Sequence, residues 1–290
     1  MSIEWQIEEF MCYCQSKQLR EKTMKSYEQS LKLFERWLKE QLKIDDVKLI
    51  KEQTIRKYIV DLQERGKYTC NANDNSKQFN CPDRRRDYRK EISNTTINNY
   101  IRNIKVFFTW LEEQRIITKN PMKNIKQLPN NRRAKDFITD EEFSRLIGKL
   151  DKSYFSEYRD FMIINLLMDS GMRLGECLAL KAEDINLTSR TIFLSEKITK
   201  GRKDRTVFFS GKTVQELKKW FMYKDRYCES IYVFPSRQSS DPISIASFET
   251  NFKSYIRRSN IKDTITPHAM IITLVLYNKL TYTNSSKDLS

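Results

Sequence analysis

The sequence predicts a mainly helical protein in two domains, with a small antiparallel sheet in the second. Three observations lead to this prediction. Apolar residues recur at helical spacing over most of the first 120 residues. Two short β-prone runs, 191–194 and 206–209, flank a basic turn and are typical of a hairpin. A stretch rich in proline, asparagine and arginine, 119–137, separates the two patterns and has the composition of a linker between domains.

The net charge is the strongest global property of the chain. Its 290 residues include 53 lysines and arginines against 38 acids, which gives a formal net charge of +15. Such an excess attracts a polyanion, most simply DNA or RNA. The acids are mixed with the bases along the chain, so the charge does not come from a disordered basic tail. On charge alone, a basic protein without a nucleic-acid partner stays an alternative.

Cysteine and histidine usage argues against a metal site. The six cysteines form no CxxC pair and there is one histidine, so ligands at short spacing are missing. We expect no metal and no cofactor. The first ten residues carry acids and no apolar core, and no apolar run reaches the length of a membrane span. We therefore expect a cytoplasmic protein with free thiols and no membrane partner.

The first predicted domain, residues 1–118, is a small helical bundle. Its apolar residues recur three and four positions apart, in a helix capped by Thr23 and again across 47–62. A last helix is expected to begin near Thr95 or Thr96, with isoleucines and phenylalanines along one side. We interpret this aromatic stripe as core packing.

A polar insertion at about 66–93 interrupts the bundle. It is rich in Asn, Asp, Ser and Gln and then turns basic at Arg84, Arg85 and Arg86. This composition predicts a long loop. Its basic half either contacts a phosphate backbone or only keeps the loop solvated, and the sequence leaves both interpretations open.

The second predicted domain, residues 138–290, mixes helices with the hairpin. Thr139 and Glu142 form the pattern of a capping box for a first helix. Further helices are predicted at 214–220 and 245–256. The hairpin turn 200–205 carries four cations and one glycine. A tip with this charge suits a nucleic-acid backbone, although an isolated hairpin of this kind is more often a solvated turn.

One segment of this domain carries a chemically specific pattern. An apolar helix leads to Gly171, a residue suited to a left-handed C-cap. The next helix begins at once and places Arg173 and Glu176 on one face. An arginine at the start of a buried helix needs an anionic partner, and a phosphate suits it because two parallel hydrogen bonds hold a phosphate to a guanidinium. By pattern alone, a surface ion pair between the two residues is the alternative.

The segment resembles the first signature box of the tyrosine recombinases, also called phage-type integrases. That box has a small residue, Gly, an aliphatic residue, Arg, any residue, a small residue or Gly, Glu, and then leucines. Here it is Ser170-Gly171-Met172-Arg173-Leu174-Gly175-Glu176, followed by Leu178 and Leu180. The resemblance implies site-specific DNA recombination or integration, as in phages and other mobile elements. It also implies that Arg173 is a catalytic arginine that contacts the scissile phosphate.

The first domain resembles the SAM-like core-binding domain of the same family. There a helix such as 96–108 is followed by an Asn-Pro pair, as at 120–121. The resemblance implies a helical clamp on one side of double-stranded DNA, joined to a mixed α+β catalytic domain. Arg102 and Lys105 lie away from the apolar stripe and are candidate phosphate contacts. A solvated helix face is an equal alternative for both.

The basic linker contributes two further candidates, Arg132 and Arg133. A linker of this charge between two DNA-facing domains is expected to lie across the duplex and complete a C-shaped clamp. We expect binding that weakens steeply with salt, because phosphate contacts release counterions. The family also implies a homo-oligomer assembled on DNA.

The hairpin resembles the β-hairpin of the family, in which a lysine just before a glycine reaches the active site. That lysine protonates the leaving 5′ oxygen. Lys200 is the match and Lys203 the runner-up. Arg202 and Lys203 are further candidate DNA contacts.

The second signature box is only half present. The family has Pro-His-x-Leu-Arg-His at the start of a helix, and Pro267, His268 and Met270 fit it. The resemblance therefore implies a catalytic role for His268, against the alternative of a structural histidine. Ile271 and Ile272 stand where the second arginine and second histidine belong.

No residue is identified as the tyrosine nucleophile. Tyr277 and Tyr282 follow the second box, but neither has the expected spacing or context. We interpret the catalytic domain as C-terminally incomplete, by truncation or by a frameshift near Met270. The uncharged apolar run 269–277 is expected to pack as a helix or strand on this domain, or else to lower solubility.

Two functions from different classes follow from these patterns. The first is an enzyme that breaks and rejoins DNA strands through a phosphotyrosyl intermediate, impaired by the missing residues. The second is a non-catalytic DNA-binding remnant of an integrase. A third, an RNA-binding basic protein, has no RNA-recognition motif to support it.

Overall fold

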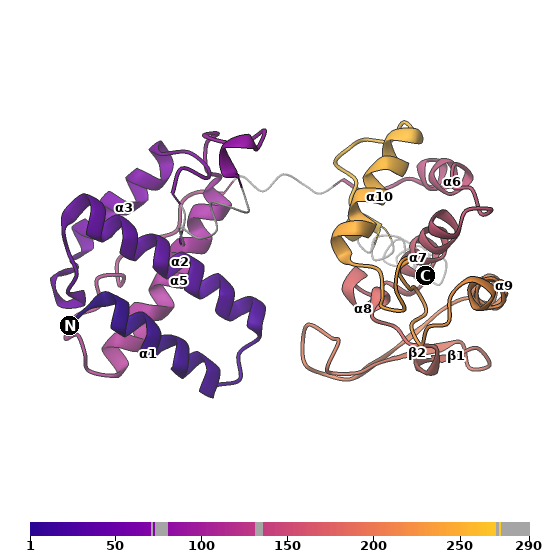
Figure 1. Cartoon of the computed structure of the whole chain (residues 1–290), viewed down its shortest axis with the longest axis horizontal. Helices are drawn as coiled ribbons and strands as arrows, with labels where there is room; N and C mark the ends of the chain where they lie inside the picture. The colour runs from indigo at the N-terminus through magenta and orange to yellow at the C-terminus, as the bar shows by residue number, and fades with distance from the viewer. Residues whose placement is uncertain (71, 73–80, 131–135, 271–272, 274–290) are drawn as a thin grey trace, which may run out of the picture. The chain divides into compact units, whose positions relative to one another are not determined.

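The computed structural model describes residues 1–70, 72, 81–130, 136–270 and 273 (Figure 1). The chain divides into two compact units, Met1–Arg132 and Arg133–Ser290. Helices dominate both, and the second unit holds a three-stranded antiparallel sheet. The predicted fold class is therefore confirmed. No helix within the described residues is long and apolar enough to cross a membrane.

Unit 1 is a helical bundle around an aromatic core. Its longer helices are α1 (Ile3–Ser16), α2 (Glu21–Trp37), α3 (Glu52–Glu64) and α5 (Asn94–Glu113). Between them lie the short π-helix η1 (Leu38–Leu42) and the 3-10 helices η2 (Val47–Leu49) and η4 (Pro82–Arg84). Phe10 on α1 meets Phe107 on α5 with ring centroids 5.5 Å apart. Phe34 on α2 meets Phe108 at 6.3 Å. These rings are buried, which confirms that the aromatic stripe is core packing.

Two helix starts differ from the predicted ones. α2 begins at Glu21, and Thr23 lies inside its first turn with its backbone N–H bonded to the carbonyl of Arg20. Thr23 is therefore not the cap. α5 begins after Ser93, whose hydroxyl accepts a hydrogen bond from the backbone N–H of Thr96. Ser93 takes the capping role because a serine oxygen satisfies an N–H that the first helical turn leaves unpaired.

A buried amide fixes the register of α5 against α2. The side chain of Asn103 donates to the carbonyl of Ser26 at 3.1 Å and to the hydroxyl of Ser30 at 2.8 Å. Asn103 is 8% exposed, so these bonds replace the water that its amide would otherwise need. The pairing leaves the neighbouring cations Arg102 and Lys105 on the exposed side of α5.

The stretch predicted as a linker begins as part of unit 1. Met122 and Ile125 are buried in the first core. Leu128 is also tied to α5, because its backbone N–H donates to the side chain of Asn98 at 2.7 Å. The apolar residues within an otherwise polar stretch explain this packing.

Unit 2 surrounds a small sheet with helices. Its elements are α6 (Asp140–Gly148), α7 (Phe155–Ser170), α8 (Leu174–Leu178), η5 (Ala182–Asp184), β1 (Ile185–Asn186), β2 (Thr191–Leu194), β3 (Arg205–Phe208), α9 (Gly211–Tyr227) and α10 (Ile245–Arg258). The strands lie in the order β1-β2-β3, and Ile192 of β2 pairs with Val207 of β3. Ile192 and Leu194 face the core, while Phe193 between them is exposed, as alternation along a strand requires.

Both predicted local signals of unit 2 are present. Thr139 and Glu142 form a reciprocal capping box at the start of α6, with bonds of 3.0 and 3.2 Å. Gly171 ends α7 in the left-handed conformation, with φ 66° and ψ 15°. α7 is buried along most of its length, so its end fixes the position from which the next helix starts.

A buried polar cluster holds α7, α10 and a loop together. Asp160 is 0% exposed and accepts bonds from Arg159 at 3.0 Å, Asn251 at 2.9 Å and Tyr255 at 2.8 Å. Arg159, 3% exposed, also donates to the carbonyl of Pro235 at 3.0 Å. Each buried charge therefore has a partner, which is the condition under which burial is tolerated.

We predict that Asp160→Ala will destabilise unit 2 by about 3–5 kcal/mol, because it leaves the Arg159 charge buried without its carboxylate. Tyr255→Phe removes one hydrogen bond from the same carboxylate and should cost only about 1 kcal/mol. Urea unfolding of the full chain measures both. Equal losses for the two variants would show that Asp160 contributes no more than an ordinary hydrogen bond.

Candidate functional site

The candidate site begins where α7 ends. After Gly171 the chain buries Met172 and then places Arg173 as the N-cap of the short helix α8. The predicted start of a new helix immediately after the glycine is confirmed. Gly175, one residue into this helix, would place an added Cβ 3.5 Å from Ile245 of α10. This is an ordinary van der Waals distance, so α8 lies beside α10 at this point.

A single buried carboxylate organises the site. Glu176 is 2% exposed and accepts bonds from the backbone N–H of Arg173 at 2.9 Å and from its Nη1 at 3.1 Å. It also accepts bonds from Nη1 and Nη2 of Arg205 at 3.1 and 2.5 Å. Both carboxylate oxygens are thus satisfied by charged or backbone donors, and the ion pair with Arg205 is bidentate.

The charge state of Glu176 follows from two opposing effects. Burial raises the pKa of a carboxyl group, but the hydrogen bonds from Arg205 and from the backbone and side chain of Arg173 favour the ionised form more strongly. The pKa of Glu176 is therefore held below its ordinary value. Glu176 is a fixed negative charge at neutral pH.

The predicted contact between Arg173 and Glu176 is present, but Glu176, not Arg173, is the buried partner. We expected the arginine charge to be the buried one that requires an anion. Instead the Arg173 side chain is 53% exposed, and its carboxylate partner is enclosed. The reason is that the guanidinium leaves the N-cap outward, while Glu176 lies on the inner face of α8 with Cys177. The exposed guanidinium can meet a ligand while Glu176 fixes its position.

Arg205 is a site residue that the sequence patterns did not identify. It lies at the start of β3, paired with Leu194 of β2. Arg205 and Val207 are partly buried, whereas Thr206 and Phe208 are exposed. The alternation of side chains along β3 could have identified Arg205 as a site residue. It places Arg205 on the inner face of the sheet, two residues from Val207.

The hairpin connection between β2 and β3 is a folded loop that presents its cations outward. Thr199 is 1% exposed, and its hydroxyl donates to the carbonyl of Lys203 at 2.9 Å. At the mouth of the loop, the backbone N–H of Glu196 donates to the side chain of Asp204 at 2.6 Å. Lys200, Arg202 and Lys203 are exposed. Figure 1 shows this loop extending away from the sheet.

His268 lies in a helical segment that packs into the second core. Residues 267–270 and Thr273 are helical, and Pro267 stands at the first position, where a proline costs no hydrogen bond. His268 is exposed, whereas Ala269 and Met270 are buried. The described part of the apolar run 269–277 thus packs as a helix. Ile271, Ile272, Tyr277 and Tyr282 lie outside the described residues.

The segment after His268 is also tied to the beginning of unit 2. The backbone N–H of Ile138 donates to the hydroxyl of Thr273 at 3.2 Å, and that hydroxyl donates to the carbonyl of Ala269 at 3.0 Å. Ile138 is 1% exposed and Thr273 is 6% exposed. The bond is therefore sheltered from water. It holds the helical segment that contains His268 against Ile138, two residues before α6 begins.

Arg173, Lys200 and His268 all belong to unit 2 and are all exposed. The start of α8, which carries Arg173, is joined to the hairpin, which carries Lys200. The link is Glu176, because both Arg173 and Arg205 of the hairpin bind its carboxylate. His268 stands on a third element. The convergence of the three groups on one phosphate stays a prediction.

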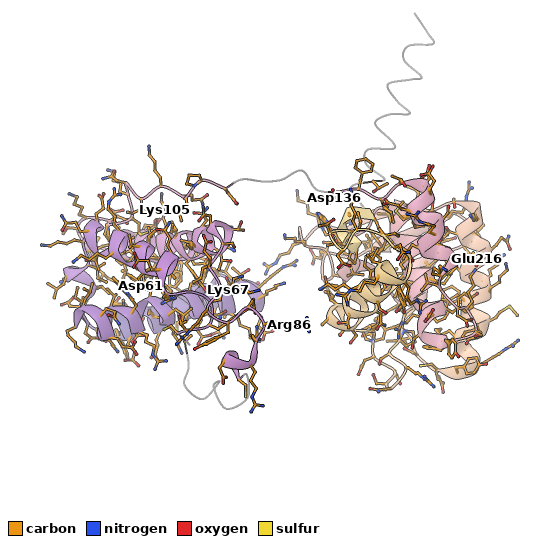
Figure 2. The ribbon with its side chains drawn as sticks, turned by 90° about the horizontal axis from the view of Figure 1, so that it is seen from above. Asp61, Lys67, Arg86, Lys105, Asp136 and Glu216 are labelled. Atoms are coloured by element: carbon orange, nitrogen blue, oxygen red, sulfur yellow. The ribbon has the colours of Figure 1, made fainter. Side chains whose placement is uncertain are left out.

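The DNA-binding candidates of unit 1 lie on the exposed side of α5. Arg102 donates to the side chain of Asn99 at 2.6 Å, which orients its guanidinium along the helix. Lys105 projects from the same helix (Figure 2). Arg132 and Arg133 lie outside the described residues.

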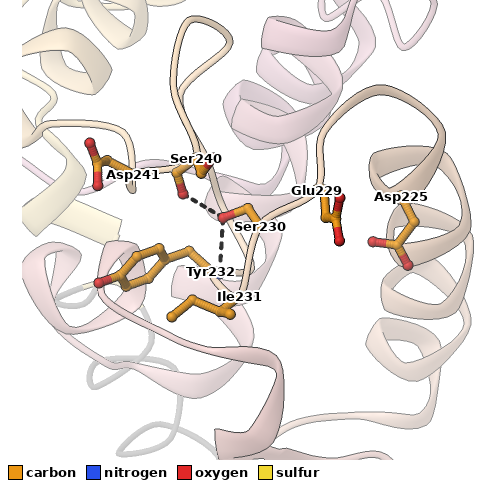
Figure 3. Close-up of a pocket in the computed structure, with 7 residues that line it drawn as sticks. All are labelled: Asp225, Glu229, Ser230, Ile231, Tyr232, Ser240 and Asp241. Atoms are coloured by element: carbon orange, nitrogen blue, oxygen red, sulfur yellow. Dashed lines mark hydrogen bonds between the residues drawn. The ribbon is translucent and has the colours of Figure 1, made fainter.

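A hollow of about 810 Å³ lies beside the end of α9 (Figure 3). Its lining includes the carboxylates of Asp225, Glu229 and Asp241, and Ser230 donates to the carbonyl of Ser240 across it. Carboxylates repel a phosphate, so this hollow does not suit the anion that Arg173 is expected to bind. Over the described ranges, no cluster of histidine, cysteine and acidic side chains is arranged to hold a metal ion.

Comparison with known proteins matches both units to one family. Residues 136–271 match the model of the phage integrase family, and residues 7–74 match the model of the phage integrase N-terminal SAM-like domain. A tyrosine recombinase of Thermosipho africanus is 34% identical over 177 residues, which cover 61% of this chain and 59% of that protein. Tyrosine recombinase XerD of Staphylococcus haemolyticus is 25% identical over 91% of this chain and 81% of its own length.

The match to several of the most similar relatives spans less than two thirds of their length, 59% for the Thermosipho africanus protein and for XerA of Pyrococcus furiosus. Among solved structures, the Tn1549 transposon integrase in complex with a circular intermediate DNA superposes with a TM-score of 0.71 at 16% identity. It covers 94% of this chain and 85% of that one. A lambda integrase dimer bound to a core site gives 0.66 at 13% identity and covers 94% and 88%. These likenesses show the same fold.

We predict that Arg205→Ala will destabilise unit 2 by on the order of 3 kcal/mol at pH 7, because it leaves the buried Glu176 charge with half of its donors. The pKa of Glu176 is lowered in the folded protein, so this stabilisation is present above the ordinary carboxyl pKa and is lost as pH falls through the lowered one. The difference from wild type should therefore shrink below about pH 4.

Urea unfolding at pH 7 and pH 3, with amide hydrogen exchange of residues 173–178, measures this effect. Lys197→Ala removes an exposed cation from the same hairpin loop and serves as the control. Equal losses for the two variants, or a difference that does not change with pH, would contradict the role assigned to the Glu176 ion pairs.

Proposed function

The chain belongs to the phage integrase family of tyrosine recombinases, and we propose that it acts in site-specific recombination or integration of double-stranded DNA. Two family models support this, one for each unit, and together they match well over half of the chain. The net charge of +15 agrees with a polyanionic partner. The proposed reaction breaks a DNA strand and rejoins it through a phosphotyrosyl intermediate, in copies of the chain assembled on DNA.

The observation that carries the proposal is the half-exposed guanidinium of Arg173 held by a buried carboxylate. A guanidinium binds phosphate through two parallel hydrogen bonds, and binding is stronger when the group is already oriented. Glu176 supplies that orientation through the bond at 3.1 Å to Nη1. We assign Arg173 to the scissile phosphate, where it stabilises the negative charge that develops on the pentavalent phosphorus.

The hairpin and the second box supply the remaining roles. In the proposed step a tyrosine oxygen attacks the phosphorus, the 3′ side becomes a phosphotyrosine, and the 5′ oxygen leaves as a hydroxyl. Lys200 gives the leaving oxygen its proton, and Lys203 is the alternative donor. His268 acts beside the same phosphate. No residue of this chain is assigned as the tyrosine nucleophile.

DNA contacts outside the reacting phosphate are assigned to exposed cations. Arg102 and Lys105 contact the backbone from α5, and Arg202 and Lys203 contact it from the hairpin loop. Arg132 and Arg133 are assigned the same role from the basic linker. We also propose a cytoplasmic location, which the six free cysteines support because thiols persist in reducing compartments.

A second candidate function is a DNA-binding remnant that occupies a site without cutting it. The sequence of the second box favours it, because isoleucines stand where an arginine and a histidine are expected. Loss of one charged donor to a developing anion costs on the order of 10²–10³ in rate, and loss of the nucleophile removes the covalent step. The sequence of the encoding DNA beyond codon 270 tests the proposed frameshift.

We predict that the two functions separate on a DNA duplex that carries a nick near the cleavage position. Cleavage at such a site releases a short fragment, so the covalent protein–DNA product accumulates. The recombinase should give an adduct that survives denaturing electrophoresis. The remnant should shift the duplex in a native gel and give no adduct.

Arg173→Ala is the matched control for the chemical step. If an adduct forms in the wild type, this variant should reduce its rate by on the order of 10²–10³, while binding in the native gel persists through the remaining contacts. An adduct that forms at an undiminished rate in Arg173→Ala would contradict the role of this arginine. A chain that neither shifts nor links to DNA would overturn both functions.

A further inference from the structure

We propose that the arginine block of the insertion, Arg84, Arg85, Arg86 and Arg89, is a second contact surface for the DNA backbone, separate from the cations of α5. The inference rests on the proposed binding of double-stranded DNA. Its new content is that an ordered part of a polar insertion contributes affinity without base specificity.

The base of the insertion is a built structure that fixes where the arginine block emerges. The backbone N–H of Lys67 donates to the carbonyl of Lys90 at 2.8 Å, and the N–H of Arg89 donates to the carbonyl of Lys67 at 3.0 Å. Gly66, with φ +77°, lies against this pairing, and an added Cβ would be 2.6 Å from the carbonyl oxygen of Arg89. Only a glycine fits this approach.

Turns and ring contacts hold the arginines themselves. The N–H of Arg84 donates to the carbonyl of Cys81 at 3.0 Å. The guanidinium of Arg85 lies 4.6 Å from the ring centre of Tyr68, and that of Arg89 lies 5.5 Å from the ring centre of Tyr88. A ring beneath a guanidinium orients the cation without using its N–H donors. Those donors stay available for phosphate oxygens.

Several helical cations of unit 1 are balanced by a neighbouring acid, and the arginine block is not. Lys25, Lys32 and Arg56 each bind a glutamate one turn away, at 2.6, 3.1 and 2.7 Å. In the described part of the chain, Arg84, Arg85 and Arg86 are exposed and form no ion pair with a carboxylate. Asp87, the acid between them and Arg89, is 3.9 Å from Lys67 instead. The positive potential of the block is therefore not cancelled locally.

The arginine block also stands apart from the contacts that the family pattern implies. In Figure 2, Arg86 lies at the margin of unit 1, well apart from Lys105 on α5. The phosphates that it meets would therefore belong to a different run of the backbone from those that Lys105 meets. Contacts of this kind raise affinity for every sequence alike, because the backbone carries no base information.

The test is the salt dependence of duplex binding by the full chain. The triple variant R84A/R85A/R86A keeps Arg89, whose backbone belongs to the paired base of the insertion. Each lost phosphate contact lowers the slope of log K against log salt by about 0.9. We expect the slope to become shallower by about 2 to 3, with the preference between duplex sequences unchanged.

Two matched variants separate this contact from a general effect of charge. K32A/R56A/K219A removes the same charge from exposed cations that are already paired with glutamates, and its slope should stay near that of wild type. R84K/R85K/R86K keeps the charge and should keep most of the slope. Circular dichroism of each variant checks that the fold is retained.

The outcomes distinguish the inference from the proposed function. A wild-type chain that does not bind duplex DNA overturns both. A wild type that binds steeply, with the same slope in R84A/R85A/R86A, overturns the inference alone. Equal losses in R84A/R85A/R86A and in the paired-cation control would also overturn it, because net charge would then explain the effect.

Discussion

The burial of one carboxylate, Glu176, is the constraint on which the site depends. A glutamate that is 2% exposed must be either neutral or paired, and here two arginines and a backbone N–H keep it ionised. The same atoms therefore connect a helix start to a hairpin. α8 is too short to be stable alone, and the hairpin carries a long exposed loop. The carboxylate of Glu176 positions both the start of α8 and the hairpin, because it binds an arginine from each.

Much of the fold follows from local patterns. The aromatic stripe of α5, Gly171 at the end of α7 and the capping box at Thr139 are local signals, and all three are found as predicted. Errors arose where two local solutions compete. Ser93, Thr95 and Thr96 are all acceptable caps by type, and the choice among them depends on where packing starts α5. α2 begins after Arg20 without a side-chain cap, so Thr23 has no capping role. Local sequence does not contain that information.

The site was predictable in part. The pattern around Arg173 placed an arginine beside a glutamate, and both the contact and the helix start are found. Which of the two charges is buried depends on tertiary packing over α8, so the expectation of a buried arginine was wrong. Arg205 is 29 residues from Glu176 along the chain. Tertiary packing of the hairpin beside α8 brings them together, and spacing along the chain does not predict that packing.

The bond between Ile138 and Thr273 joins two segments of unit 2 that are distant in sequence. Ile138 is the first buried residue after the stretch that connects the two units, and Thr273 is one turn beyond the segment that carries His268. The bond therefore spans 135 residues of chain and closes unit 2 upon itself, entry against helix. A substitution of Thr273 alters the support of the helical segment that carries His268 without touching an exposed cation.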